Sequence, residues 1–253
     1  VGDFSWHIGG CISYTKDKIL EMGEEYHPYS YMYRTGHSIT ALTLYTSDGL
    51  YSTSDFDSKG NLLPKYPHST LDGKGVKPGD IRYKDISGDG VIDVNDKQYM
   101  DQYHTLPSVV YGIQLGFKWK GLGFEATFDG RINQYAQLTT GSIYWPLYND
   151  DKNISMHYYN NRWTPENQNA KMPRVAYNTT SPSLSSNVMS DFWIQNASYL
   201  RMKNLQFGYT LPKKVLSSVG IQNVRFYYSV ENLFTIHNML INVDPEIPSE
   251  RAS

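Results

Sequence analysis

Residues 85–96 carry oxygen-bearing groups at a regular spacing. The groups are the side chains of Asp85, Ser87, Asp89, Asp93 and Asp96 at positions 1, 3, 5, 9 and 12, and the carbonyl of Val91 at position 7, directly after Gly90. Calcium takes about six to eight oxygen ligands from a loop with this spacing. The pattern therefore predicts a structural Ca²⁺ site. The alternative is a turn-rich loop whose Asp side chains accept hydrogen bonds from their own backbone.

A second group of residues between 144 and 163 is aromatic. It consists of Tyr144, Trp145, Tyr148, Tyr158, Tyr159 and Trp163. Flat aromatic faces stack on sugar rings and also pack against other proteins. We therefore predict weak contacts from this segment to a substrate or a partner protein. The alternatives are packing within the loop and an aromatic girdle at a membrane interface.

The sequence shows no motif that would support catalysis. It has no Gly-x-Ser-x-Gly turn, no Walker loop, no dinucleotide fingerprint and no His-Glu-x-x-His pair. Asp and Glu are plentiful, but no pair stands out as the acid and base of a glycosidase. The single Cys11 excludes an intrachain disulfide and a cysteine-based zinc site. We expect a protein that is not an enzyme.

The composition narrows the choice of partner and compartment. A formal net charge of -2 provides no basic patch for phosphates, so nucleic acid is not an expected partner. Hydrophobic residues make up 40% of the chain and aromatic residues 14%, yet no run reaches the roughly 18 apolar residues that a membrane-spanning helix requires. A membrane location therefore requires strands that expose apolar side chains at alternate positions.

Strands are the elements that would hold these loops in place. Residues 109–119 alternate between apolar and polar or small side chains, and the alternation resumes over 122–133 after a two-residue connection. This pattern predicts a β-hairpin. The same alternation predicts strands near 4–15, 198–210 and 224–236. A weaker pattern predicts one over 37–46.

The lengths of the connections alternate as well. Residues 120–121 and 211–222 are short or compact connections, whereas 47–108 and 134–197 are long and rich in Gly, Pro, Asn, Asp and Tyr. Transmembrane β-barrels join their strands by short periplasmic turns and long external loops. We therefore predict an all-β fold, an antiparallel transmembrane β-barrel segment with long extracellular loops. Its polar face, expected to line the lumen as a wall or a substrate path, would carry Glu125, Asp129, Arg131, Arg225 and Glu231.

Four stretches, taken in order, resemble the SusC/RagA branch of the TonB-dependent transporters. They are Pro78-Gly79-Asp80-Ile81-Arg82-Tyr83-Lys84-Asp85, Pro107-Ser108-Val109-Val110-Tyr111-Gly112, Tyr199-Leu200-Arg201-Met202-Lys203-Asn204-Leu205 with Gly208-Tyr209-Thr210-Leu211-Pro212, and Ser229-Val230-Glu231-Asn232-Leu233-Phe234-Thr235. The resemblance covers most of residues 36–247. It implies a barrel of about 22 strands with an N-terminal plug in the bacterial outer membrane. It also implies import of glycan or peptide nutrients with a SusD-like surface lipoprotein, powered by TonB through a part of the protein outside these residues.

Under this resemblance the chain is the C-terminal part of such a barrel, and the plug, the rest of the barrel and outer-membrane lipid are its further partners. The expected organisation is barrel strands over 1–46, an extracellular loop with the Asp-rich motif over 47–108, a barrel hairpin over 109–133, an aromatic-rich extracellular loop over 134–197, barrel strands over 198–236, and over 237–253 a last extracellular loop that stops before the closing strand. Six strands with open edges would aggregate in water.

Two other functions fit part of the pattern. A secreted soluble β-domain that binds carbohydrate would also use aromatic side chains and a structural calcium loop, but its apolar rows would face a second sheet. A β-sandwich glycosidase would need two acidic residues that converge in a cleft.

Overall fold

The computed structural model describes residues 3–71, 75–137, 154–175, 188–217, 220–239 and 244–246. The chain divides into two compact units. The sheet unit is made of Val1–Lys16, Leu106–Tyr135 and Asn196–Met239. The loop unit is made of Asp17–Thr105, Ala136–Gln195 and Leu240–Ser253.

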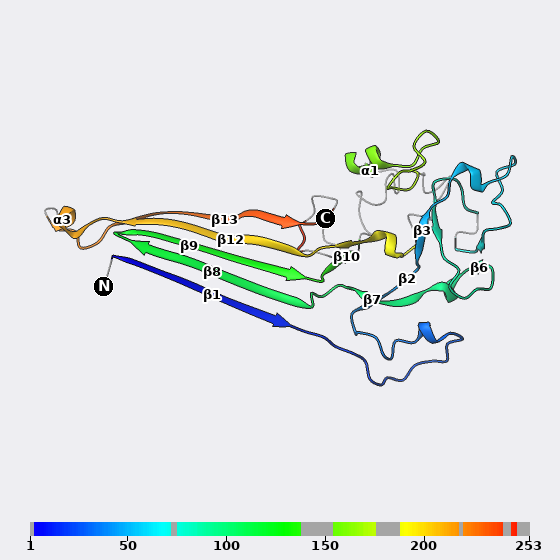
Figure 1. Cartoon of the computed structure of the whole chain (residues 1–253), viewed down its shortest axis with the longest axis horizontal. Coiled ribbons are helices and arrows are strands. Elements are labelled where there is room, and N and C mark those ends of the chain that lie inside the picture. The colour runs from blue at the N-terminus through cyan, green and yellow to red at the C-terminus, as the bar shows by residue number, and fades with distance from the viewer. Residues whose placement is uncertain are drawn as a thin grey trace. The chain divides into compact units, whose positions relative to one another are not determined.

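The sheet unit contains one antiparallel sheet of five long strands (Figure 1). In spatial order these are β1 (Phe4–Tyr14), β8 (Val109–Trp119), β9 (Leu122–Ile132), β12 (Tyr199–Thr210) and β13 (Arg225–His237). The short helix α3 (Lys213–Leu216) lies in the connection between β12 and β13. Within the described residues, β1 and β13 are the two edges, so the sheet stays open.

The predicted hairpin of β8 and β9 is confirmed. Trp119 pairs with Leu122 across the turn, and the register continues to Val109 opposite Ile132. The two turn residues, Lys120 and Gly121, have φ of 45° and 90°. Positive φ at both positions matches the right-handed twist of the strands, which is why a two-residue connection is enough.

The predicted barrel strand over 37–46 is wrong. Within this span, Ala41–Leu44 forms β2, which pairs with β7 (Gln98–His104) in the loop unit, while β1 pairs directly with β8. The sheet therefore has five described strands and not six, and its first strand ends at Tyr14, well before residue 46. The physical reason is that Leu44 is fully buried within the loop unit, so a local strand pair satisfies this short apolar run.

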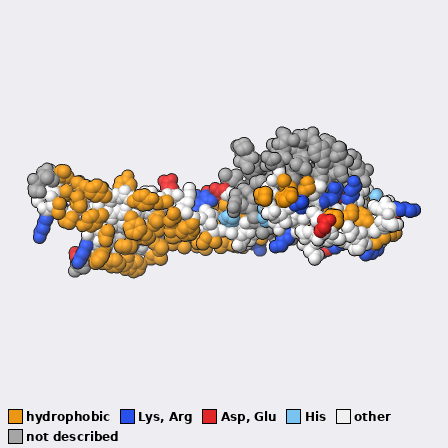
Figure 2. Space-filling view, turned by 90° about the horizontal axis from the view of Figure 1, so that it is seen from above, with side chains coloured by type: hydrophobic (Ala, Val, Ile, Leu, Met, Phe, Trp, Pro, Cys, Tyr) orange, Lys and Arg blue, Asp and Glu red, His pale blue; other side chains and the backbone are white. Residues whose placement is uncertain are grey.

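The register gathers apolar side chains on one face of the sheet. Two neighbouring rows run across all five strands: Trp6, Phe117, Phe124, Phe207 and Tyr228, and beside it Phe4, Trp119, Leu122, Tyr209 and Phe226. Ring centroids in the first row lie 5.3 Å apart for Phe117 and Phe124 and 5.0 Å apart for Phe124 and Phe207. The ends of this row remain open, with Trp6 68% and Tyr228 71% exposed. Figure 2 shows hydrophobic side chains crowded over the strands.

The loop unit is built from short strand pairs and 3₁₀ turns. Besides β2 with β7, the antiparallel pair is β3 (Ser47–Leu50) with β5 (Ile81–Tyr83), and the parallel pair is β4 (His68–Ser69) with β6 (Val91–Ile92). The helix α1 (Met156–Asn161) follows its N-cap Ser155, whose hydroxyl accepts the Tyr158 N–H. β10 (Tyr135–Gln137) and β11 (Ile194–Asn196) form a further two-stranded pair. None of the helices in the described parts of the chain is long and apolar enough to span a membrane.

Candidate functional site

The Asp-rich loop is held by hydrogen bonds to its own backbone. Asp96, which is fully buried, accepts the N–H groups of Ile86 at 2.8 Å, Ser87 at 3.0 Å and Asp93 at 2.9 Å. Asp96 ends the 3₁₀ helix η3 (Val94–Asp96), and Asp93 caps the start of that helix by accepting the Asn95 N–H at 2.7 Å. The two carboxylates thus fix the second half of the loop.

Asp85 organises the first half of the loop in the same way. Its oxygens accept the N–H groups of Gly88 at 2.6 Å and Gly90 at 2.8 Å and the hydroxyl of Ser87 at 3.1 Å. Burial acts to raise the pKa of Asp85, but the Gly90 and Gly88 donors outweigh it and hold the pKa below its usual value. This is the arrangement that the turn-rich alternative expects.

The predicted Ca²⁺ ligands do not form a cage in this arrangement. In the parts of the chain that the structure describes, no three His, Cys, Asp or Glu side chains meet in a metal-binding geometry. Asp89 accepts the Val91 N–H at 2.8 Å and is exposed. Calcium binding therefore remains a prediction from the spacing.

The described aromatic residues divide into buried and exposed. Tyr144, Trp145 and Tyr148 lie outside the described residues. Tyr158 is 2% exposed and Trp163 7%, so neither can present a ring to a sugar, and their predicted contact to a substrate is corrected to a core position in the loop unit. Tyr159 is 47% exposed, and the Arg162 guanidinium lies 3.7 Å from its ring centroid.

The turn before β5 explains why Trp163 is buried. Gly79 has φ of 87°, and a Cβ placed on it would lie 2.6 Å from Cε3 of Trp163. Only glycine allows both this backbone and the approach of the indole. The next residue, Asp80, is fully buried against Arg174. Gly79 and Asp80 thus hold the segment that carries Trp163 and Arg174, a contact that the sequence alone did not predict.

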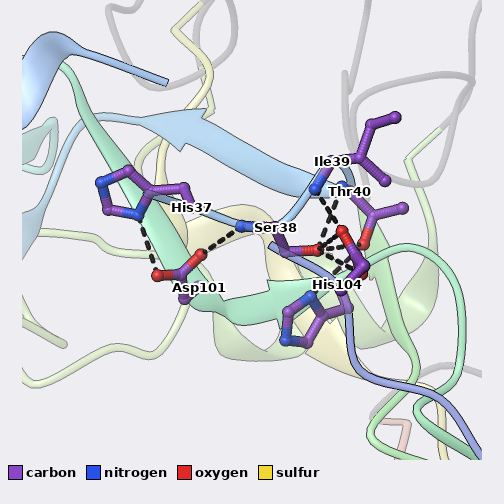
Figure 3. Close-up of polar contacts among 7 residues, drawn as sticks. His37, Ser38, Ile39, Thr40, Asp101 and His104 are labelled. Atoms are coloured by element: carbon purple, nitrogen blue, oxygen red, sulfur yellow. Dashed lines mark hydrogen bonds and ion pairs between the residues drawn. The ribbon is translucent and has the colours of Figure 1, made fainter. Parts of the chain in front are cut away.

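A polar cluster ties the segment after β1 to β7 (Figure 3). Asp101 of β7 accepts the Ser38 N–H at 3.0 Å, and its other oxygen lies 2.8 Å from Nδ1 of His37. Asp17 accepts the Ser38 hydroxyl at 2.9 Å and the Ile39 N–H at 2.6 Å. Ser, His and Asp thus lie together here, as in hydrolytic sites.

The cluster nevertheless lacks the geometry of a nucleophile and its base. The Ser38 hydroxyl donates to Asp17, and the His37 ring turns to Asp101, so the two side chains diverge (Figure 3). A nucleophilic serine needs its base within hydrogen-bond reach. These hydrogen bonds instead hold the two ends of residues 17–40 together and fix Ser38 to β7.

The polar face of the sheet carries an ordered group of charged residues. The centroid of the Tyr199 ring lies 5.8 Å from the guanidinium carbon of Arg131 and 5.5 Å from that of Arg201. Its hydroxyl donates to Asp129 at 3.2 Å, and Arg201 donates to the Thr235 hydroxyl at 2.8 Å. The register places Glu125, Glu231 and Arg225 on this same face, as the alternation predicts.

Comparisons with known proteins find similarity to TonB-dependent receptors and to the RagAB structures. No family model matches the chain. The structure of the RagAB peptide transporter superposes with a TM-score of 0.61 at 18% identity, over 94% of this chain and 24% of that one. The RagAB peptide importer in its open-open state superposes with a TM-score of 0.61 at 21% identity, over 96% of this chain and 24% of that one.

Among curated proteins, TonB-dependent receptor P3 of Formosa agariphila is 27% identical over 260 residues, and the alignment covers 96% of this chain. TonB-dependent receptor SusC of Bacteroides thetaiotaomicron is 27% identical over 177 residues, or 68% of the chain. The chain is similar to TonB-dependent receptors, SusC among them, and has the fold of the RagAB structures.

The chain spans about a quarter or less of the length of the relatives that it matches, 23% of receptor P3 and 16% of SusC. These relatives are receptors and transporters, not enzymes. The fold-class prediction is confirmed: the chain is an antiparallel all-β segment with the fold of the RagAB structures. The five described strands supply part of a barrel wall and do not close one.

Proposed function

We propose that this chain forms wall and external loops of an outer-membrane barrel that imports nutrients, either glycans or peptides. A SusD-like surface lipoprotein would bind on the side of the loop unit. Energy from TonB would reach the barrel through a plug supplied by the rest of the protein. The fold of RagAB and the identity to TonB-dependent receptors support this proposal.

The observation that carries the proposal is the open apolar face of the sheet. Rows such as Trp6 to Tyr228 cross all five strands, and both ends of that row are more than two-thirds exposed. In water, such a single-layer sheet with free edges would aggregate. In a bilayer, the apolar face meets lipid, the polar face lines a wet lumen, and the edges pair with further strands.

The two other functions lack this support. A soluble carbohydrate-binding domain needs a second sheet over the apolar rows, and no described part of the sheet unit provides one. A glycosidase needs two converging carboxylates, and the relatives are not enzymes. The solved relatives are named as peptide transporters, whereas the polar face offers charged and hydrogen-bonding groups to either cargo.

Neighbouring residues in β8 provide a matched test. Leu115 and Gln114 lie near the middle of the strand on opposite faces. In the full-length protein, Leu115→Arg places a charge in the hydrocarbon region, which costs about 2–4 kcal/mol near the bilayer midplane. Gln114→Arg places the same charge in the lumen and is expected to change stability little. The measurements are yield of folded protein in outer-membrane fractions and thermal unfolding in detergent.

The partner and the transport step need separate measurements. We expect the tagged native protein to bring down a surface lipoprotein from detergent extracts. Deletion of the gene for the tagged protein should abolish growth on one class of glycan or peptide. Equal effects of the two Arg variants, or folded protein that remains in solution without detergent, would overturn the barrel assignment. Failure to recover a lipoprotein would remove only the partner.

A further inference from the structure

The sheet unit has a recess at the end where its short connections lie. The recess measures about 260 Å³ and is lined by Asp3, Lys118, Trp119, Lys120, Gly121, Leu122, Gly123, Thr210 and Arg225. These residues surround the turn between β8 and β9 and the adjoining ends of β12 and β13. The turn is packed against β12, because the Thr210 N–H donates to the Gly121 carbonyl at 2.8 Å.

Polar-face residues, Gly123 among them, form part of the lining of the recess, and Gly208 of β12 lies beside Gly123. Gly123 pairs with Gly208, and Lys118 pairs with Gly123 on the other side. The Arg225 guanidinium lies over Gly208, since a Cβ placed on this glycine would be 2.8 Å from its Nε and 2.9 Å from its Nη2. Glycine in a strand commonly marks close approach of a ligand or another group. The missing side chains make the space that Arg225 occupies.

Three cationic residues, Lys118, Lys120 and Arg225, line this recess, and the Lys120 Nζ lies 5.6 Å from the centroid of the Trp119 ring. Among the described residues, no ion pair involves Lys118, Lys120 or Arg225. Asp3 contributes one carboxylate to the lining, which leaves an excess of two positive charges. An arginine fork with two lysines suits an oxyanion. The nearby carboxylate favours a singly charged group over a doubly charged one, because it repels the second charge.

We infer that this recess binds a carboxylate group, presented by an acidic peptide or acidic sugar on the lumenal side of the barrel. Arg225 donates to both carboxylate oxygens, and Lys118 and Lys120 supply the remaining positive charge. The recess follows from the contacts of the sheet unit alone. Only its place on the route of the cargo depends on the proposed function.

The test uses the full-length protein in detergent and a fluorescent acidic peptide, with the same peptide carrying Gln in place of Glu as the uncharged probe. We expect saturable, salt-sensitive binding of the acidic peptide only, and a loss of roughly tenfold or more in Arg225→Gln and Lys118→Gln. Acetate should compete better than inorganic phosphate at equal ionic strength, and Asp3→Asn should narrow that difference.

Gly208→Ala separates a built site from a mere excess of charge. This variant keeps all three cations but forces the Arg225 guanidinium away from its place over residue 208. Its matched control is Gly9→Ala, also on the polar face, where a Cβ would meet nothing within 4 Å. We expect weaker binding in the first variant and unchanged binding in the second. Absence of binding, or equal affinity in Gly208→Ala and wild type, would overturn the carboxylate site. Neither result would bear on the proposed transport function, which the growth experiment tests.

Discussion

Nε of Arg174 lies 2.8 Å from Oδ1 of Asp80, although the two residues are 94 positions apart in the sequence. The Asp80 side chain is fully buried and that of Arg174 is 14% exposed. The second Asp80 oxygen accepts the Lys77 N–H at 2.9 Å. One ion pair therefore joins the turn before β5 to the segment after α1, and it does so inside the core of the loop unit.

Breaking this pair should loosen the loop unit. Because removal of one partner leaves a buried charge without compensation, we expect Asp80→Asn to destabilise the unit by about 3 kcal/mol. The control is Asp48→Asn, whose partner Arg82 lies 3.0 Å away in an exposed pair worth about 0–1 kcal/mol. Hydrogen–deuterium exchange of residues 77–83 and 162–174 measures both. Equal exchange in the two variants would show that the buried pair does not hold the unit together.

The aromatic residues of the second long loop should separate into two classes. Trp163→Ala removes a buried indole from its place over Gly79 and should cost about 3–5 kcal/mol of stability. Tyr159→Ala removes an exposed ring and should leave stability nearly unchanged. If the loop contacts cargo or partner through this residue, Tyr159→Ala weakens that binding alone. Thermal unfolding and pull-down of the lipoprotein distinguish the two effects, and a stable Trp163→Ala protein would contradict the core assignment.

Calcium binding to residues 85–96 is tested by its effect on exchange. The spacing predicts that added Ca²⁺ slows amide exchange in this loop and that Asp89→Asn, which removes one ligand charge, abolishes the effect. Asp57→Asn is the control, because Asp57 accepts the N–H groups of Lys59 and Asn61, both at 2.8 Å, in a turn outside this loop. Identical exchange with Ca²⁺ and with chelator would show that backbone hydrogen bonds alone hold the loop.

Acid should open the segment clamped onto β7. The Ile39 N–H and the Ser38 hydroxyl hold the pKa of Asp17 below its usual value, and the Thr35 hydroxyl and the Arg34 N–H do the same for the pKa of Glu24. A carboxylate whose pKa is lowered on folding stabilises the fold above its unfolded pKa, near about 4. That contribution is lost as the pH falls through the lower, folded pKa.

A fluorophore attached through Tyr26→Cys, in a Cys11→Ser background, reports this opening. We expect its mobility to rise on acidification below pH of about 4 and to recover on neutralisation. In Ser38→Ala, Asp17 loses one donor, so the transition should move to higher pH. A transition at the same pH in both proteins would exclude Asp17 as its cause.

The alternation of side chains predicted most of the sheet and failed where alternation is short. Over 109–133 the period of two fixes both the strands and their partner, because the connecting turn has only two residues. The run Ala41–Leu44 has the same local character, but it is satisfied by β7 more than fifty residues later. Periodicity shows that a strand exists, and it does not show which strand pairs with it.

The candidate sites were predictable only where the chemistry is local. The Asp-rich loop could be located because its donors and acceptors are within twelve residues of one another. Arg174 could not be assigned to Asp80, since a single sequence carries no sign of contact between distant residues. The recess at Arg225 was also missed, because it depends on two glycines from different strands that face each other.

Because β1 pairs directly with β8, the residues between these strands form an insertion that the sheet does not need for its own pairing. The excursion leaves the sheet after Tyr14 and returns before Val109, and the Thr15 N–H donates to the Ser108 carbonyl at 2.8 Å. Its two ends are thus held one strand spacing apart by the wall itself. Chimaeras that exchange residues 16–107 between this protein and its relatives should therefore keep the strand register of the five-stranded sheet, so this segment can vary without a change in the sheet.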